Sequence, residues 1–100
     1  MAAQKIVWTN PANDDFDELI QFVEQNWSPE MAIKCVNTVY KALDQIEQMP
    51  GIGVPSQKVA DVRRKIVQPH TAIYYKPIGI SIFLLRLLDT RSNPDNNPFE

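Results

Sequence analysis

Apolar residues recur at helical spacing through the first half of the chain and then gather in short, strand-like runs in the second half. One helical face is marked by Ala12, Phe16, Leu19, Ile20, Val23 and Trp27. A second stripe follows and consists of Ala32, Val36, Val39, Tyr40, Leu43 and Ile46. Because steps of three and four residues place side chains on one face of a helix, the pattern predicts two amphipathic helices.

The residues that begin and end helices agree with this pattern. Asn10-Pro11 and Ser28-Pro29 each place a capping side chain before a proline at the first helical position. Met49-Pro50-Gly51 ends the second helix, since proline cannot continue it. The second start follows directly after the first stripe, so we predict an antiparallel helical hairpin whose second helix runs from Pro29 to about Gln48.

Four segments are strand-like. A short run, Lys5–Thr9, precedes the first helix, and a loop at residues 50–61 is followed by Val62–Val67, Thr71–Lys76 and Ile80–Leu88. Short connections join the last three, so antiparallel neighbours are expected. The order β-α-α-β-β-β predicts a single α+β domain over residues 1–100: an antiparallel sheet packed on one face by an N-terminal helical hairpin, with residues 92–100 as an extended or frayed tail.

The last of these strands is apolar on both faces. Alternation assigns Ile80, Ile82, Leu84 and Leu88 to one face and Phe83, Leu85 and Leu87 to the other. Two helices cover only one face of a sheet, and an exposed apolar patch usually marks a partner site. Two alternatives follow: either a partner binds the second face, or the loop at residues 50–61 or the tail covers it.

Charge divides the chain into an acidic and a basic part. Residues 1–57 carry three lysines against eight acidic residues, a net charge of −5, whereas residues 58–91 carry seven Lys and Arg against two Asp, a net charge of +5. A basic region suggests an anionic partner; the alternative is a solvated surface whose charges balance within the fold. Alternation sends Arg64 to one face of its strand and Arg63 and Lys65 to the other.

Arg86 interrupts an apolar strand, where a guanidinium needs a partner. Asp89, a carboxylate of a neighbouring strand and a bound peptide are the alternatives for that partner. Arg91 follows at the end of the strand, where an arginine is well placed to recognise phosphate or carboxylate groups.

Most catalytic constellations are missing from the sequence. The single cysteine, Cys35, and the single histidine, His70, exclude an internal disulfide, a cysteine-based zinc site and a multi-histidine metal site, and we expect no cofactor. Cys35 lies close to the apolar stripe of a helix, where a structural role is favoured over a nucleophilic pair with His70. Residues 1–5 contain no apolar signal core and no run is long enough to span a membrane, so we expect a cytosolic protein without a membrane partner.

Four stretches, in this order and spacing, resemble the ParE/RelE superfamily, the toxins of type II toxin–antitoxin modules. The resemblance extends from Ile6 to about Pro94. The stretches are Ala12 with Asp14–Leu19, Ala42–Ile46 followed by Met49–Gly53, Val62–Arg64 followed by Ala72–Tyr75, and Leu84–Arg91. The resemblance implies the same β-α-α-β-β-β toxin fold.

The superfamily contains two kinds of toxin. RelE-like members are ribosome-dependent mRNA endoribonucleases, which place an arginine at the position of Thr71 and, in some members, a histidine at about Asp89. Phosphodiester cleavage needs cationic stabilisation of developing charge, which threonine cannot supply. Tyr74-Tyr75 and Leu85–Leu88 look more like the ParE branch, whose studied members poison DNA gyrase and lack the nuclease residues.

The resemblance therefore implies a ParE-like toxin that binds a protein target such as DNA gyrase. It also implies a cognate antitoxin with an acidic, amphipathic C-terminal segment. The residues expected to bind target or antitoxin are Arg64, Phe83, Leu85, Arg86, Leu87, Asp89 and Arg91. Two alternatives stay open: a degenerate, non-toxic binding module, and a RelE-like endoribonuclease that cleaves mRNA on the ribosome with Arg63, Arg64, Lys65 and Arg91 as catalytic residues.

Overall fold

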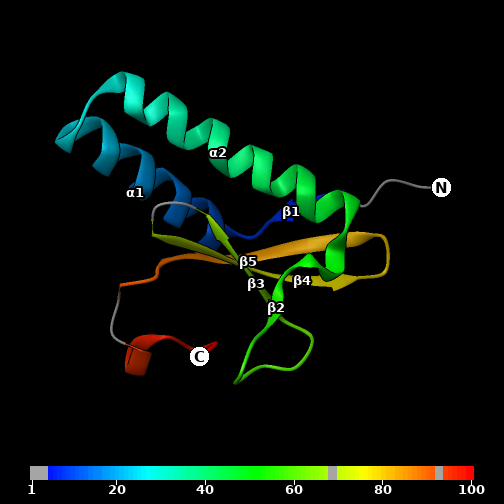
Figure 1. Cartoon of the computed structure of the whole chain (residues 1–100). Coiled ribbons are helices and arrows are strands. Elements are labelled where there is room, and N and C mark those ends of the chain that lie inside the picture. The colour runs from blue at the N-terminus through cyan, green and yellow to red at the C-terminus, as the bar shows by residue number, and fades with distance from the viewer. Residues whose placement is uncertain (1–4, 68–69, 92–93) are drawn as a thin grey trace.

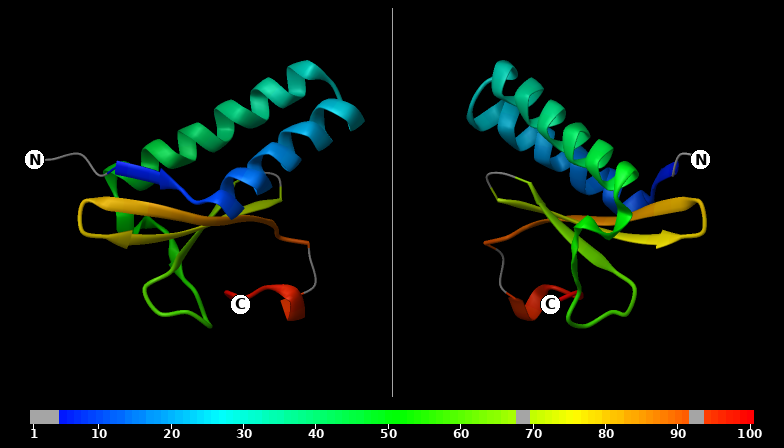
Figure 2. Two further views of the ribbon diagram at one scale, coloured as in Figure 1. Left: turned by 180° about the vertical axis from the view of Figure 1, so that it is seen from behind. Right: turned by 45° about the vertical axis from the view of Figure 1, so that its right-hand side comes forward.

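Two helices lie on one side of a five-stranded sheet, and the last residues of the chain lie on the other side (Figures 1 and 2). The structure is a computed structural model that describes residues 5–67, 70–91 and 94–100. Its elements are β1 (Lys5–Trp8), α1 (Asn10–Asn26), α2 (Pro29–Gln48), β2 (Val54–Pro55), β3 (Arg63–Val67), β4 (Thr71–Ile78) and β5 (Ser81–Asp89), with the 3-10 turns η1 (Pro50–Ile52) and η2 (Pro94–Asn96). The predicted α+β class and element order are confirmed; η1 and the short β2 lie within the predicted loop.

The strands lie in the order β1-β5-β4-β3-β2. As predicted, β3, β4 and β5 pair antiparallel, and β2 pairs antiparallel with the start of β3. In contrast, β1 runs parallel to β5, so the sheet is mixed rather than wholly antiparallel. Most of the chain separates β1 from β5, and no hairpin turn therefore dictates the direction of this edge strand.

Both helices begin where a hydroxyl side chain caps them. Ser28 Oγ accepts a hydrogen bond from the Met31 N–H at 3.1 Å, as predicted. The prediction of Asn10 as the first cap is wrong by one residue, because Thr9 is the N-cap and Asn10 already belongs to α1. Thr9 Oγ1 accepts from the Ala12 N–H at 3.4 Å and donates to the Leu84 carbonyl at 2.6 Å, and so ties the start of α1 to β5.

The larger core lies between the sheet and the helical hairpin. It consists of Ala12, Val39, Ala42, Leu43, Ile46, Val67, Ile73, Tyr75, Ile82, Leu84 and Leu87. At its border the rings of Trp8, Phe16 and Tyr40 meet with centroid separations of 5.1 to 6.4 Å and join β1, α1 and α2. Trp27, predicted on the buried stripe, is instead 71% exposed, because the tip of the hairpin projects beyond the sheet (Figure 1).

A β-bulge in β5 changes which residues face the helices. Tyr74 lies opposite Arg86 but the next residue, Tyr75, lies opposite Leu84, so Leu85 is the extra residue. Beyond the bulge, Leu87 joins the helix-side core and Leu88 packs on the other side. The predicted faces of these two leucines are therefore wrong, because strict alternation does not continue through a bulge.

The sheet surface turned away from the helices carries a second, smaller core. We call this surface the far face and define it by Val62, Arg64, Ala72, Tyr74, Leu85 and Leu88. Phe99 is buried against it. The expectation of an extended or frayed tail is therefore wrong for residues 94–100, which form η2 and then lie against the far face, because burial of the Phe99 ring holds them there; residues 92 and 93 lie outside the described residues (Figure 2).

Candidate functional site

Arg64 and Tyr74 form the centre of the far face. They lie opposite each other on β3 and β4, so their side chains emerge on the same side of the sheet. The Phe99 ring stacks on the Tyr74 ring with a centroid separation of 4.6 Å and an interplanar angle of 19°. Glu100 Oε1 lies 2.9 Å from Arg64 Nη1. The far face is thus an aromatic surface beside a cation, and an aromatic–acidic pair of the same chain occupies it.

The loop that follows β2 holds the backbone of this pair. The Phe99 carbonyl accepts hydrogen bonds from the Ser56 hydroxyl and from the N–H groups of Gln57 and Lys58, the latter two at 3.2 and 3.3 Å. Lys58 Nζ donates to the Asn97 carbonyl at 3.0 Å. Among the alternatives left open by the sequence, coverage of this face by the tail and the loop together is the one the structure contains.

Arg86 has an internal partner that the sequence analysis did not name. Its Nε lies 2.6 Å from Asp15 Oδ2 and its Nη2 lies 3.0 Å from Asp15 Oδ1, a bidentate pair between β5 and α1. The same Oδ2 accepts the Leu87 N–H at 3.0 Å. The hydrogen bonds that the Arg86 guanidinium donates to Asp15 raise its pKa above the usual value. Asp89 is therefore the wrong partner for Arg86, because the α1 carboxylate already occupies the guanidinium.

Asp89 pairs instead with Arg91 at the end of β5. Asp89 Oδ2 lies 2.9 Å from Arg91 Nη2, and Asp89 Oδ1 accepts from the Arg91 Nε at 3.1 Å and from its backbone N–H at 2.8 Å. The side-chain hydrogen bonds, followed by the backbone one, lower the pKa of Asp89 to about 2. Both side chains are exposed, so the pair remains accessible to a partner in solution.

The predicted apolar contact residues separate into two groups. Leu87 is buried in the helix-side core, which removes it from any partner-binding surface. Phe83 and Leu85 are half-buried, and Leu85 packs against the far-face cluster. The structure therefore keeps Arg64, Phe83, Leu85 and the Asp89–Arg91 pair as candidate contacts.

The residues of the alternative catalytic set do not converge. Arg63 Nη1 donates to the Gly53 carbonyl at 2.7 Å, whereas Arg64 emerges on the far face. Lys65 borders a small hollow beside α2. Arg63 lies opposite Tyr75, in the second half of β4. Arg91 lies beyond the other end of β4, since its partner Asp89 pairs with Thr71, the first residue of that strand. No single phosphate could contact all four side chains.

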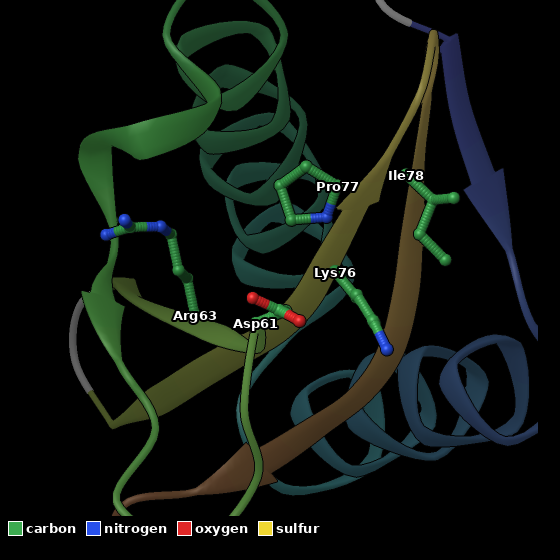
Figure 3. A pocket seen from close by; sticks show the side chains of 5 residues that line it. All are labelled: Asp61, Arg63, Lys76, Pro77 and Ile78. Atoms are coloured by element: carbon green, nitrogen blue, oxygen red, sulfur yellow. The ribbon is translucent and has the colours of Figure 1, made fainter.

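An open hollow of about 470 Å³ lies at the end of β4 that β3 does not reach. It is lined by Asp61, Arg63, Lys76, Pro77 and Ile78 (Figure 3). In this view the Arg63 and Lys76 side chains point in different directions, and the Asp61 carboxylate lies between them. The two cations thus do not meet at one point, as they would in a phosphate site.

The hairpin also carries a set of exposed apolar side chains that the sequence pattern did not predict. Besides Trp27, Phe22 is 55% and Ile33 is 62% exposed. Phe22 and Ile33 are not members of the predicted stripes. An apolar residue that lies off the stripe of an amphipathic helix points to solvent, and this position in the pattern could have predicted their exposure.

The thiol of Cys35 and the potential metal ligands are the remaining candidates for a reactive site. Cys35 is half-buried on α2, and burial raises the pKa of its thiol. Within the ranges that the structure describes, no three His, Cys, Asp or Glu side chains gather as a metal site requires. None of the described helices combines the length and apolarity that crossing a membrane demands.

Comparisons with known proteins agree with this architecture. A family model described as the ParE toxin of type II toxin-antitoxin system, parDE, matches residues 6–94. Toxin ParE1 of Caulobacter vibrioides is 23% identical over 82 residues, which are 82% of this chain and 84% of that protein. A solved structure of the chromosomal ParDE TA system from P. aeruginosa matches with a TM-score of 0.76 at 21% identity and covers 88% of this chain and 97% of that chain. This structural match establishes a shared fold.

Proposed function

The chain belongs to the ParE toxin family of type II toxin–antitoxin systems, and on this basis we propose that it inhibits growth by binding a protein target such as DNA gyrase, without chemistry of its own. A cognate antitoxin neutralises it. The observation that carries the proposal is Thr71, which begins β4 where the nuclease branch has an arginine. Thr71 lies opposite Asp89, whose charge is matched by Arg91.

The internal contacts of the basic residues support a non-catalytic toxin over an endoribonuclease. RNA cleavage needs a general base, a general acid and cations that converge on one phosphate. Arg63 binds a loop carbonyl, Arg64 binds Glu100 and Arg91 binds Asp89. These contacts hold the guanidinium groups apart, so the geometry favours a surface that binds another protein.

The antitoxin proposal rests on the chemistry of the far face and of the adjoining end of β5. An acidic, amphipathic segment that folds on binding matches a surface with half-buried apolar side chains beside arginines. Phe83 and Leu85 supply the apolar contacts, and Arg64 and Arg91 supply the cations.

Expression from a tightly repressed promoter, followed by a supercoiling assay with purified gyrase, tests the target. We expect growth arrest on induction and a dose-dependent loss of supercoiling, with no new 5′ ends in ribosome-bound mRNA. New mRNA ends with supercoiling intact would replace the proposal with the endoribonuclease. Unaffected growth together with unaffected supercoiling would leave only a non-toxic binding module.

A pair of cation removals tests the antitoxin surface. Arg91→Ala should weaken binding of the co-purified antitoxin about two- to fivefold, because an exposed charge pair contributes little energy. Lys34→Ala removes a cation from the exposed side of α2 and should leave binding unchanged. Calorimetric titration measures both; equal affinities for the two variants would exclude Arg91 from the interface.

A further inference from the structure

We infer that the far face is a binding site for an extended partner segment in which an aromatic residue is followed directly by an acidic one, and that Asn97–Glu100 occupy this site in cis. The partner is a segment of the antitoxin. Only that identity rests on the proposed function, because the chemistry of the site is defined by the contacts of the residues that now fill it.

The aromatic half of the site is built on Tyr74. This ring is 2% exposed, and Phe99, which stacks on it, is 8% exposed. Leu85 and Leu88 pack against the same cluster. Without an occupant, a tyrosine ring and two leucines would face water on the sheet, and stacked aromatic pairs are favourable beyond the area that they bury. The site therefore selects an aromatic side chain.

The half of the site that binds the acidic residue is built on Arg64. The cis segment leaves part of the hydrogen-bonding capacity of this guanidinium unused. Glu100 contacts Nη1 of the guanidinium through one oxygen at 2.9 Å. Arg64 Nε is buried and has no hydrogen-bond partner within the described part of the chain. A carboxylate that contacts two nitrogens of the fork satisfies more of its donors. A partner acid in that geometry would therefore compete well against Glu100.

The backbone of the occupant is held through two carbonyl groups, that of Asn97, which accepts from Lys58 Nζ, and that of Phe99. The Phe99 carbonyl is the acceptor for Ser56, Gln57 and Lys58, and the Phe99 N–H donates to Asn97 Oδ1 at 2.8 Å within the segment itself. The segment pairs with no strand of the described sheet. Its release leaves the ladders and the helix-side core intact, so this site can exchange one occupant for another without unfolding the protein.

The test uses the full chain with its cis occupant weakened and a peptide as the probe. In the variant Phe99→Ala/Glu100→Gln the two recognised side chains are removed. The probe is the acetylated and amidated peptide Asp-Asn-Asn-Pro-Phe-Glu, the sequence of residues 95–100. We expect the variant to bind the peptide with a Kd below about 0.1 mM, because a cis segment at an effective concentration of about 1 mM then fills roughly nine-tenths of the sites. Amide NMR signals of Gln57 and Lys58 should shift as it binds.

Wild-type protein should bind the same peptide at least tenfold more weakly, because its own segment competes at high effective concentration. The matched host control is Phe22→Ala/Glu24→Gln, which removes the same residue types from exposed positions of α1 and should behave as wild type. Replacing Phe by Ala or Glu by Gln in the peptide should each lower its affinity for the Phe99→Ala/Glu100→Gln protein about tenfold. Adding Arg64→Gln to that protein should lower its affinity for the unchanged peptide by a similar factor.

A folded Phe99→Ala/Glu100→Gln protein that takes up no peptide would overturn the inference, as would uptake that does not depend on Arg64. A dimer of the wild-type chain that exchanges this segment between copies would also overturn it, by assigning the site to a second copy. Dispersed β4 and β5 amide signals establish that the variant is folded. Because the measurement is peptide binding alone, its failure is distinguishable from a failure of the growth or supercoiling assays.

Discussion

At the scale of single residues, Tyr75 and Gly53 fix the passage of the chain from α2 into the sheet. The Tyr75 hydroxyl donates to the Pro50 carbonyl at 2.8 Å and accepts the Gly53 N–H at 2.9 Å. Burial, the largest influence, raises the pKa of Tyr75 above its ordinary value, in keeping with a neutral phenol that donates. A Cβ on Gly53 would lie 2.6 Å from the Tyr75 hydroxyl oxygen and 2.8 Å from the Arg64 carbonyl oxygen, whereas one on Gly51 would meet nothing within 4 Å.

Gly53→Ala should therefore lower the free energy of unfolding by about 1–3 kcal/mol, the usual cost of forcing extra atoms into a packed site. Gly51→Ala, two residues away, should change it by less than about 0.5 kcal/mol, since the new methyl group enters open space. Urea titrations of the two variants measure the difference. Equal losses would contradict the close packing of Gly53 against Tyr75.

The Asp89–Arg91 pair makes a prediction about pH. The folded pKa of Asp89 is lowered from 3.8 to about 2, so its stabilising effect is present above pH 3.8 and is lost as the pH falls through 2. An NMR titration of the carboxyl carbon should give this low pKa in wild type. Arg91→Gln should return the pKa only part of the way, because the Arg91 backbone N–H still donates to Asp89.

Lys76→Gln is the control for this titration, since it removes a cation near the other end of β4 and should leave the pKa of Asp89 unchanged. A wild-type pKa near 3.8 would mean that the ion pair does not persist in solution. High salt should weaken the shift, because both side chains are exposed.

At the scale of elements, side chains at the start of α1 bind the backbone of β5 beyond the point where β1 ends. β1 pairs with β5 only as far as Leu84. Beyond that point Thr9 donates to the Leu84 carbonyl and Asp15 accepts the Leu87 N–H, so two side chains stand in for a neighbouring strand. Asp15→Ala should cost about 2 kcal/mol, because it leaves a peptide N–H and the Arg86 guanidinium without their acceptor.

Asp14→Ala is the matched control, because Asp14 is exposed on the same helix and should change stability by less than about 0.5 kcal/mol. A double-mutant cycle with Asp15→Ala and Arg86→Ala gives the coupling between the two side chains. Indistinguishable stabilities for Asp14→Ala and Asp15→Ala would show that the edge of β5 does not depend on this carboxylate.

These contacts mark where sequence reasoning succeeds and where it stops. The helices and the last three strands follow from local spacing and capping, so they were predicted to within a few residues. The bulge at Leu85 depends on the register between two strands, and the Asp15–Arg86 pair joins residues 71 positions apart. A local sequence pattern contains neither the register between two strands nor a contact between distant residues. For this reason Leu87 was predicted on the wrong face, and Asp15 was not predicted as the partner of Arg86.

At the scale of the whole molecule, the division between an acidic and a basic part is partly resolved inside the fold. Asp15 from the acidic part neutralises Arg86, and Glu100 neutralises Arg64. The sequence indicated Arg64, Leu85, Asp89 and Arg91 as surface contacts, and all four lie at or beside the far face or the end of β5. It did not indicate Tyr74 and Phe99, because a stacked pair made by a β-strand and a tail has no sequence period.

The two cores predict that this molecule opens in two steps. The helix-side core joins both helices to the central strands, whereas the far-face core depends on Phe99 and on the loop amides that hold its carbonyl. In native-state hydrogen exchange, the amides of Gln57 and Lys58 should therefore open with a free energy below that of global unfolding and with a weaker dependence on urea, because releasing residues 97–100 exposes the far-face core but not the helix-side core.

Phe99→Ala should remove most of the protection of these two amides and leave the slowest amides of β4 and β5 unchanged, since the helices still cover the other side of the sheet. Phe22→Ala deletes an exposed ring of the same size and should change neither set. Exchange of Gln57 and Lys58 that merges with the global isotherm in wild type would contradict this. In that case the tail would be part of the cooperative unit, and no partner could displace it short of unfolding the sheet.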